Sequence, residues 1–265
     1  MTIIFFIFGL IIGSFLNAVI YRLRVVESLF ERSHCPKCRN KIRWFDNIPI
    51  LSFLILSAKC RDCGEKISWA YPAVEFSVGA VFAIIGKYFF SPLLISTWIP
   101  TFFYLVIFSL LIIIFVYDYK YMEIPMIILY LAVGITILYY LQADFVNFER
   151  AAGFFSLHIF SGLLAGILAF SMFFSLSYFS KETWMGMGDA YIGFLGGLLV
   201  GWSKVFFMLT LSFTIGALFG LILILTKKKT MKSQIPFAPF LVVGIFLVII
   251  VPEIFPSLKL FLLYF

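Results

Sequence analysis

The four cysteines form two closely spaced pairs, Cys35–Cys38 and Cys60–Cys63, with 21 residues between the pairs. Each C-x-x-C pair supplies two thiolates from one tight turn, and two such pairs suit a tetrahedral zinc ion. Two disulfides or free thiols are the alternatives, but a reducing cytoplasm disfavours disulfides. Four thiolates leave no position open for water, so we predict one structural zinc ion per chain without a catalytic role. We expect His34, next to Cys35, to be a surface residue rather than a ligand.

Two aspartates, Asp118 and Asp189, stand at the ends of long apolar stretches, in "FVYDYKYMEIP" and "GMGDAYIGFLGG". An ionised aspartate at the centre of a membrane helix costs about 2.5–3.5 kcal/mol, so each position invites a functional explanation. Two carboxylates that share a site hold one proton between them and thereby supply an acid and a base. Such a pair activates water for attack on a peptide carbonyl, as in aspartic proteases. For either aspartate alone, capping of a helix is the alternative.

Glycines surround the second aspartate. Gly186 and Gly188 precede it, and we expect them to free the backbone so that an extended substrate can approach. Gly193, Gly197 and Gly201 then recur every four residues, which is the spacing of close packing between membrane helices.

The composition predicts a membrane protein, because 63% of the 265 residues are hydrophobic and only 12% are charged. Spanning segments should be helices, since lipid offers no partners to an open backbone. We therefore predict an all-α polytopic membrane protein with about eight transmembrane helices and a small cytoplasmic zinc-ribbon-like insertion after the first one. The candidate spans, of which the sixth is short, are 3–21, 73–90, 99–117, 125–141, 155–179, 189–202, 205–226 and 236–251.

The distribution of basic residues predicts the orientation in the membrane. Residues 22–71 carry ten of the twenty Lys and Arg residues, and the loop after the seventh span carries Lys227, Lys228, Lys229 and Lys232. With the N-terminus outside, both loops are cytoplasmic, as the positive-inside rule requires. Both aspartates then lie at the cytoplasmic face. The net charge of +7 therefore reflects topology, and we expect no nucleic-acid partner.

Three regions follow from these spans. Residues 1–21 form the first transmembrane helix, 22–71 a cytoplasmic zinc-binding domain, and 72–265 a membrane-embedded aspartic peptidase domain. The apolar residues within "IRWFDNIPILSFLIL", between the cysteine pairs, are too few to span a membrane. We interpret them as the core of the zinc-binding domain or as a segment lying on the membrane.

Ordered sequence blocks along nearly the whole chain resemble the bacterial type IV prepilin peptidases, which are bifunctional prepilin leader peptidase/N-methyltransferases of the GxGD aspartic protease group. The blocks are "GSFLNAVIYRL", "CPKC", "IRWFDNIPILS", "CRDCGEKIS", "YPAVE", "DYKYMEIP", "GMGD" and "IPFAPFL". The resemblance implies that Asp118 and Asp189 are the catalytic pair and that the four cysteines bind zinc.

The resemblance also implies the substrates and the location of the enzyme. Prepilins and pseudopilins with short basic leader peptides are cut after a glycine, at the cytoplasmic face of the bacterial inner membrane. The new N-terminal residue is then N-methylated with S-adenosylmethionine as the methyl donor.

The methyl-donor site is expected within residues 13–75. Its candidate polar contacts are Asn17, Arg22, Asp46, Asn47 and Glu75. The sequence departs from the family pattern at Arg24, Ala70, Tyr191 and Ala238, and Tyr191 stands where the family has a lysine. A peptidase without methyltransferase activity is therefore one alternative function. A transporter with a zinc-ribbon loop and intramembrane carboxylates is another.

Overall fold

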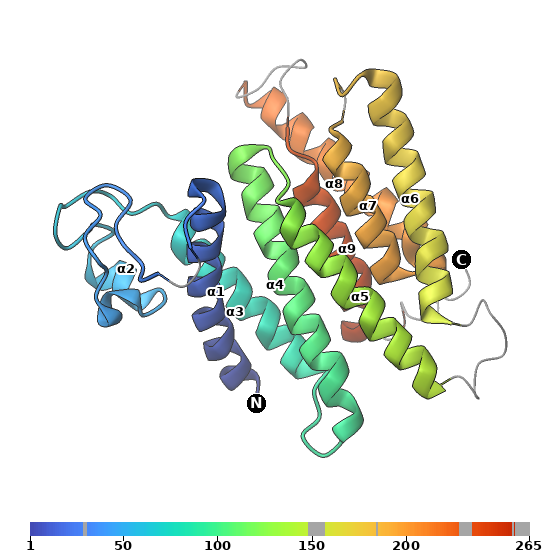
Figure 1. Cartoon of the computed structure of the whole chain (residues 1–265), viewed down its shortest axis with the longest axis horizontal. Coiled ribbons are helices and arrows are strands. Elements are labelled where there is room, and N and C mark those ends of the chain that lie inside the picture. Colours follow the sequence, from blue (N-terminus) through green and yellow to red (C-terminus); the bar gives the residue numbers. More distant parts are fainter. Residues whose placement is uncertain (29–30, 148–156, 184, 228–234, 256, 258–265) are drawn as a thin grey trace. The chain divides into compact units, whose positions relative to one another are not determined.

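The computed structural model describes residues 1–28, 31–147, 157–183, 185–227, 235–255 and 257. Within these residues the chain is helical and has no strand beyond two isolated β-bridges. The helices are α1 (Thr2–Val25), η1 (Trp44–Asn47), α2 (Leu51–Ile55), α3 (Ala70–Tyr88), η2 (Ile95–Thr97), α4 (Trp98–Tyr121), α5 (Met126–Asn147), α6 (His158–Ser180), α7 (Met187–Val200), α8 (Trp202–Leu225) and α9 (Ala238–Ile254) (Figure 1).

The long helices match the predicted spans, which confirms a polytopic helical membrane protein. Six of the described helices are long and apolar enough to cross a membrane, namely α1, α3, α4, α5, α6 and α8. The apolar helices α7 and α9 are shorter and correspond to the sixth and eighth predicted spans. Lys228, Lys229 and Lys232, on which the predicted orientation partly depends, lie outside the described residues.

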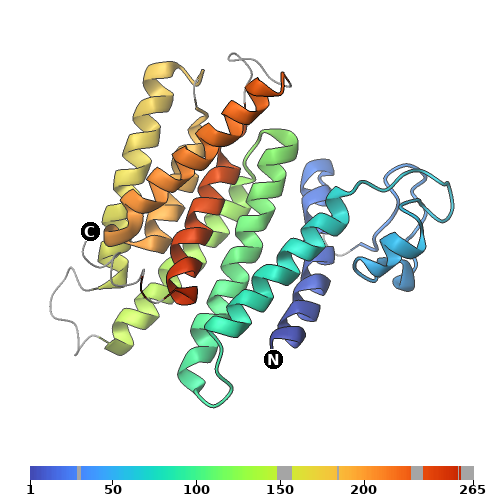
Figure 2. The same cartoon turned by 180° about the vertical axis from the view of Figure 1, so that it is seen from behind.

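The chain divides into two compact units, Met1–Val116 and Tyr117–Phe265. In the first unit α1 packs along α3, as both views of the molecule show (Figures 1 and 2). Two glycines of α1 allow the close approach. A Cβ on Gly9 would lie 2.8 Å from the Cα of Gly79, and one on Gly13 would lie 2.7 Å from the Cα of Glu75.

In the second unit α7 packs closely on α6. A Cβ on Gly197 would lie 2.5 Å from the backbone of Ala165, and one on Gly193 would lie 2.5 Å from the ring of Phe173. The predicted packing role of these two glycines is thus confirmed. Gly201 ends α7 with a φ of +76°, and it also faces α6, because a Cβ there would lie 3.2 Å from the Ser161 Oγ atom.

The apolar segment between the cysteine pairs is only partly buried. Ser52 and Phe53 of α2 are buried, whereas Leu51, Leu54 and Ile55 are 56%, 60% and 75% exposed. The interpretation of the segment as the core of the zinc-binding domain is therefore wrong for these three residues. A helix of five residues offers one inner face, and Phe53 occupies it by packing on Trp69 with ring centroids 4.8 Å apart.

Gly197→Ala is expected to lower the melting temperature of the protein in detergent. The added methyl group must displace the backbone of α6 at Ala165, and overpacking of this kind typically costs about 1–3 kcal/mol. Gly134→Ala in α5 is the matched control, because nothing lies within 4 Å of a Cβ at Gly134. Equal melting temperatures for the two variants would contradict the close packing of α6 and α7.

Candidate functional site

The second unit buries both aspartates that the sequence singles out. Asp118 lies in the last turn of α4 and Asp189 in the first turn of α7, and their exposed fractions are 6% and 7%. The two carboxylates are close enough to repel each other. Each is also reached by one backbone N–H group, that of Ala238 for Asp118 and that of Gly186 for Asp189. The fold thus brings together two acidic residues that lie 71 positions apart in the sequence.

The surroundings of this pair lack compensating positive charge. Among the described residues, no ion pair joins either carboxylate to a lysine, arginine or histidine. The Oδ2 atom of Asp118 is buried without a hydrogen-bond partner in the described part of the chain. Leaving a buried polar atom unsatisfied costs about 1–3 kcal/mol, and more for a charged group. A shared proton, a water molecule or a substrate carbonyl would satisfy this oxygen.

The two glycines before Asp189 differ in their surroundings. Gly186 has an extended backbone at the start of α7, and a Cβ there would meet only the Asp189 Oδ2 atom, 4.0 Å away. Gly188 is helical, and a Cβ there would collide with the side chain of Ile124. A Cβ would therefore fit at Gly186 among the described residues, whereas Gly188 allows α7 to pack on the segment that follows Asp118.

The four cysteines of the first unit form a cluster that can hold a metal ion such as zinc. They are free thiols, and their Sγ atoms all lie within 4.8 Å of one another. The Sγ atoms of Cys35 and Cys63 are 3.9 Å apart. Zn–S bonds of about 2.3 Å in a tetrahedron separate the sulfurs by about 3.8 Å, so the cluster has the right size. His34 is not part of it, because its Nε2 lies 3.6 Å from the Glu27 carboxylate.

The two cysteine pairs sit on matching backbone turns. The Cys35 N–H donates to the Asn40 carbonyl and the Cys60 N–H to the Glu65 carbonyl, at 3.0 and 2.8 Å. An antiparallel bridge closes each turn, His34 with Lys41 and Lys59 with Lys66. The residue after each second cysteine, Arg39 or Gly64, has a positive φ, of 58° and 71°. This repeated geometry aims all four sulfurs at one point.

The thiols of the cluster differ in acidity. Burial acts to raise the pKa of Cys35, but the backbone N–H groups of Cys38 and Lys37 outweigh it and lower this pKa to about 7. The Glu65 N–H acts to lower the pKa of Cys63, but burial and the neighbouring thiols raise it to about 12. A divalent cation ionises every thiol that coordinates it, so metal binding would release protons.

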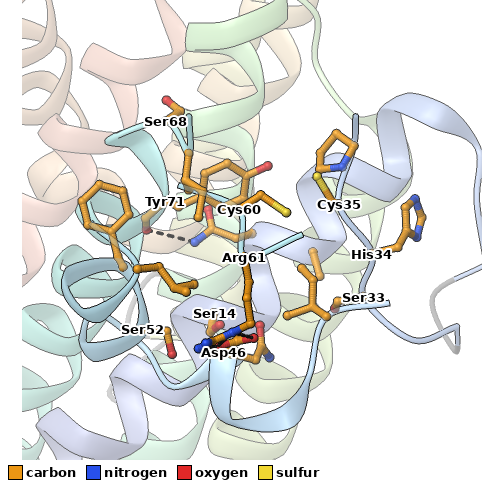
Figure 3. A pocket seen from close by; sticks show the side chains of 18 of the residues that line it. Ser14, Ser33, His34, Cys35, Asp46, Ser52, Cys60, Arg61, Ser68 and Tyr71 are labelled. Carbon is orange, nitrogen blue, oxygen red and sulfur yellow. Dashed lines mark hydrogen bonds and ion pairs between the residues drawn. The ribbon is translucent and has the colours of Figure 1, made fainter. Parts of the chain in front are cut away.

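A cavity of about 360 Å³ lies in the first unit, beside the cysteine cluster (Figure 3). Its lining includes all five residues predicted for the methyl-donor region, namely Asn17, Arg22, Asp46, Asn47 and Glu75. They come from α1, from η1 and from α3, so the fold gathers residues from three separate parts of the sequence. Pockets for small molecules typically measure about 300–1,000 Å³.

Hydrogen bonds fix the polar side chains of this cavity. The Asn17 amide donates to the Tyr71 carbonyl at 3.0 Å, and the Glu75 carboxylate accepts the Ile50 N–H at 2.8 Å. Arg61 donates to Asp46 at 2.6 Å and holds the pKa of that carboxyl below its usual range.

Sequence reasoning missed Arg61 at the cavity. It lies beside a cysteine of the second pair, and only the folded loop brings it to Asp46.

Comparison with known proteins places these two sites in a family. Residues 7–89 match the bacterial peptidase A24 N-terminal domain, and residues 105–221 match the type IV leader peptidase family. A prepilin leader peptidase/N-methyltransferase of Vibrio cholerae is 36% identical, over 79% of this chain and 81% of the relative. One of Bacillus subtilis is 35% identical, over 91% and 90%. The chain belongs to the type IV leader peptidase family.

Each of the two family matches covers one of the two sites. The N-terminal match includes the cysteine cluster and the cavity, and the second match includes both aspartates. No solved structure matches the chain. As a member of this family the chain is a multi-pass membrane protease, and the transporter alternative is set aside.

Metal analysis of the purified protein is expected to give about one zinc ion per chain, because a tetrahedral site takes one thiolate from each of the four cysteines. Cys63→Ser should lose the metal. His34→Ala is the matched control and should keep it, since the imidazole is outside the cluster. Metal-free wild-type protein, or loss of the metal from His34→Ala as well, would contradict the four-cysteine site.

Proposed function

We propose that this protein is an aspartic endopeptidase that removes the leader peptides of type IV prepilins and pseudopilins. Asp118 and Asp189 are its catalytic pair. The observation that carries the proposal is the juxtaposition of two buried carboxylates that no described lysine, arginine or histidine pairs with, within the region that matches the leader peptidase family. Relatives with the printed name prepilin leader peptidase/N-methyltransferase support the substrate class.

The chemistry needs one proton shared between the two carboxylates. The ionised carboxylate takes a proton from a water molecule, and the water oxygen attacks the carbonyl carbon of the scissile peptide bond. The protonated carboxyl donates its proton to the carbonyl oxygen. The tetrahedral intermediate then collapses, the C–N bond breaks, and the amine leaves with a proton from the pair. Among the described residues a Cβ at Gly186 would meet nothing closer than the Asp189 Oδ2 atom, 4.0 Å away, which supports an approach of the leader peptide at this glycine.

The active pair faces the cytoplasm of a bacterial inner membrane in this proposal. The ten basic residues of 22–71 support that orientation, because cytoplasmic loops carry an excess of lysine and arginine. Cleavage follows a glycine at the end of a basic leader.

The same chain N-methylates the new N-terminus of its product, with S-adenosylmethionine as the methyl donor. The cavity in the first unit supports this second activity through its size and its lining. Asp46, Glu75 and Asn17 can hydrogen-bond the hydroxyl and ammonium groups of such a donor. The zinc ion has a structural role here, since it ties together a loop region that has few buried apolar residues.

Asp118→Asn and Asp189→Asn are each expected to lower prepilin cleavage at least about 100-fold, because an amide cannot exchange the proton that the reaction needs. Cleavage is measured by co-expression with a prepilin and the mass of the product. Glu123→Gln, an exposed carboxylate in the loop after α4, is the matched control and should cleave normally. Normal cleavage by both aspartate variants would rule out the proposed pair.

Glu75→Gln is expected to lower N-methylation of the product by about tenfold or more while cleavage persists, because a hydrogen bond to a charged group contributes about 1.5–3 kcal/mol. The amide oxygen can still accept the Ile50 N–H, so the local fold is kept. The mass of the mature N-terminus, with or without one methyl group, provides the measurement. Glu27→Gln, outside the cavity lining, is the control. An unmethylated product from the wild-type enzyme would favour a peptidase without methyltransferase activity.

A further inference from the structure

Residues 44–56, here called the α2 segment, expose an unusual amount of apolar surface. Trp44 is 76% exposed and Ile48 40%, and Leu51, Leu54 and Ile55 of α2 are exposed as well. Contiguous exposed apolar side chains mark contact with a partner or with a membrane. Other residues of the segment line the cavity, among them the polar Asp46, Asn47 and Ser52.

A hydrogen bond fixes the position of the α2 segment along the axis of α1. The Ile50 N–H donates to the Glu75 carboxylate of α3, and the backbone of Glu75 packs against Gly13 of α1. Gly13 lies near the middle of α1, and at 1.5 Å per residue it is about 18 Å from the end of that helix at Val25. Both views accordingly show α2 beside α1 rather than beyond its end (Figures 1 and 2). Because α1 is long and apolar enough to cross a membrane, we expect its middle at the depth of the hydrocarbon.

Several backbone N–H groups of the α2 segment are hydrogen-bonded within the protein, as membrane depth requires. Polar backbone groups at membrane depth need partners within the protein or in a water-filled cavity. The N–H groups of Ser52, Leu54 and Leu56 donate to carbonyls within the segment, at 2.9–3.1 Å. Ser52 Oγ donates to the Phe45 carbonyl at 2.8 Å. The side chains of Asp46, Asn47 and Ser52 face the cavity, which keeps them out of the lipid.

Trp44, at the start of the α2 segment, and Trp69, which contacts the segment, suit a membrane interface. Trp44 is exposed next to the exposed Arg43, and the 72% exposed Trp69 packs on Phe53. Tryptophan is enriched where hydrocarbon meets water, and arginine extends its charge toward the headgroups. Residues 22–71 carry ten Lys and Arg residues against five Asp and Glu residues, which fits an anionic membrane surface.

We propose that the α2 segment is a re-entrant element whose apolar face, formed by Leu51, Leu54 and Ile55, is covered by the lipid of the bilayer. The bilayer thereby supports the outer side of the wall that closes the cavity. The inference depends on the position of this segment in the first unit, and it holds whether or not the cavity binds a methyl donor.

Fluorescence quenching in lipid nanodiscs tests the proposal with the full-length, metal-loaded protein. A tryptophan is placed on the apolar face by Leu54→Trp, after the five natural tryptophans are replaced by phenylalanine. Lys37→Trp in the same background is the matched control, since Lys37 is 69% exposed in the first cysteine turn. We expect lipids brominated along their acyl chains to remove most of the Leu54→Trp fluorescence and little of the Lys37→Trp fluorescence. Aqueous acrylamide should quench in the opposite order.

Two outcomes would overturn the proposal. Equal acrylamide quenching of both variants, without quenching by brominated lipid, would show that the α2 segment lies in water. Protection of Leu54→Trp from both quenchers would show that protein covers the face, as in a contact with substrate or with a second copy of the chain. If Leu54→Trp loses its metal and its fold, Ile55→Trp gives the same readout, because Ile55 is 75% exposed and has room for the larger ring.

Discussion

The burial of charge in an apolar helix bundle is the constraint on which the second unit depends. An isolated carboxylate is expensive at this depth, and two neighbouring carboxylates also repel each other. Backbone N–H groups of Ala238 and Gly186 reach them. The remaining cost is relieved when the pair shares a proton or binds a water molecule and a carbonyl. The shared proton that the proposed catalysis needs therefore also lowers the cost of burying Asp118 and Asp189.

Close helix packing holds this pair in place. Larger side chains at positions 193 and 197 would collide with α6 and keep α7 away from it. Gly197 and Gly193 remove that obstacle, and Gly188 lets the first turn of α7 approach Ile124, six residues after Asp118. The glycines around the aspartate thus act mainly through the space that they leave. Gly186 is the exception, because a Cβ there would fit among the described residues.

The first unit uses different means to order a polar region at a membrane. Four thiols on two matching turns gather at one point, and the Glu75 carboxylate holds the α2 segment at the level of α1. Between them lies a cavity whose polar groups are fixed by hydrogen bonds. Leu51, Leu54 and Ile55 of α2 lie outside the lining of this cavity and are exposed.

The sequence by itself determined the helical membrane class, the approximate spans and the paired cysteines, because apolar length and C-x-x-C spacing are local properties. Only the tertiary structure decided that five polar residues from α1, η1 and α3 line one cavity, that Arg61 joins Asp46 there, and that Leu51, Leu54 and Ile55 point away from the core. These features depend on contacts between segments far apart in the chain. The close approach of α1 and α3 at Gly13 is one such contact.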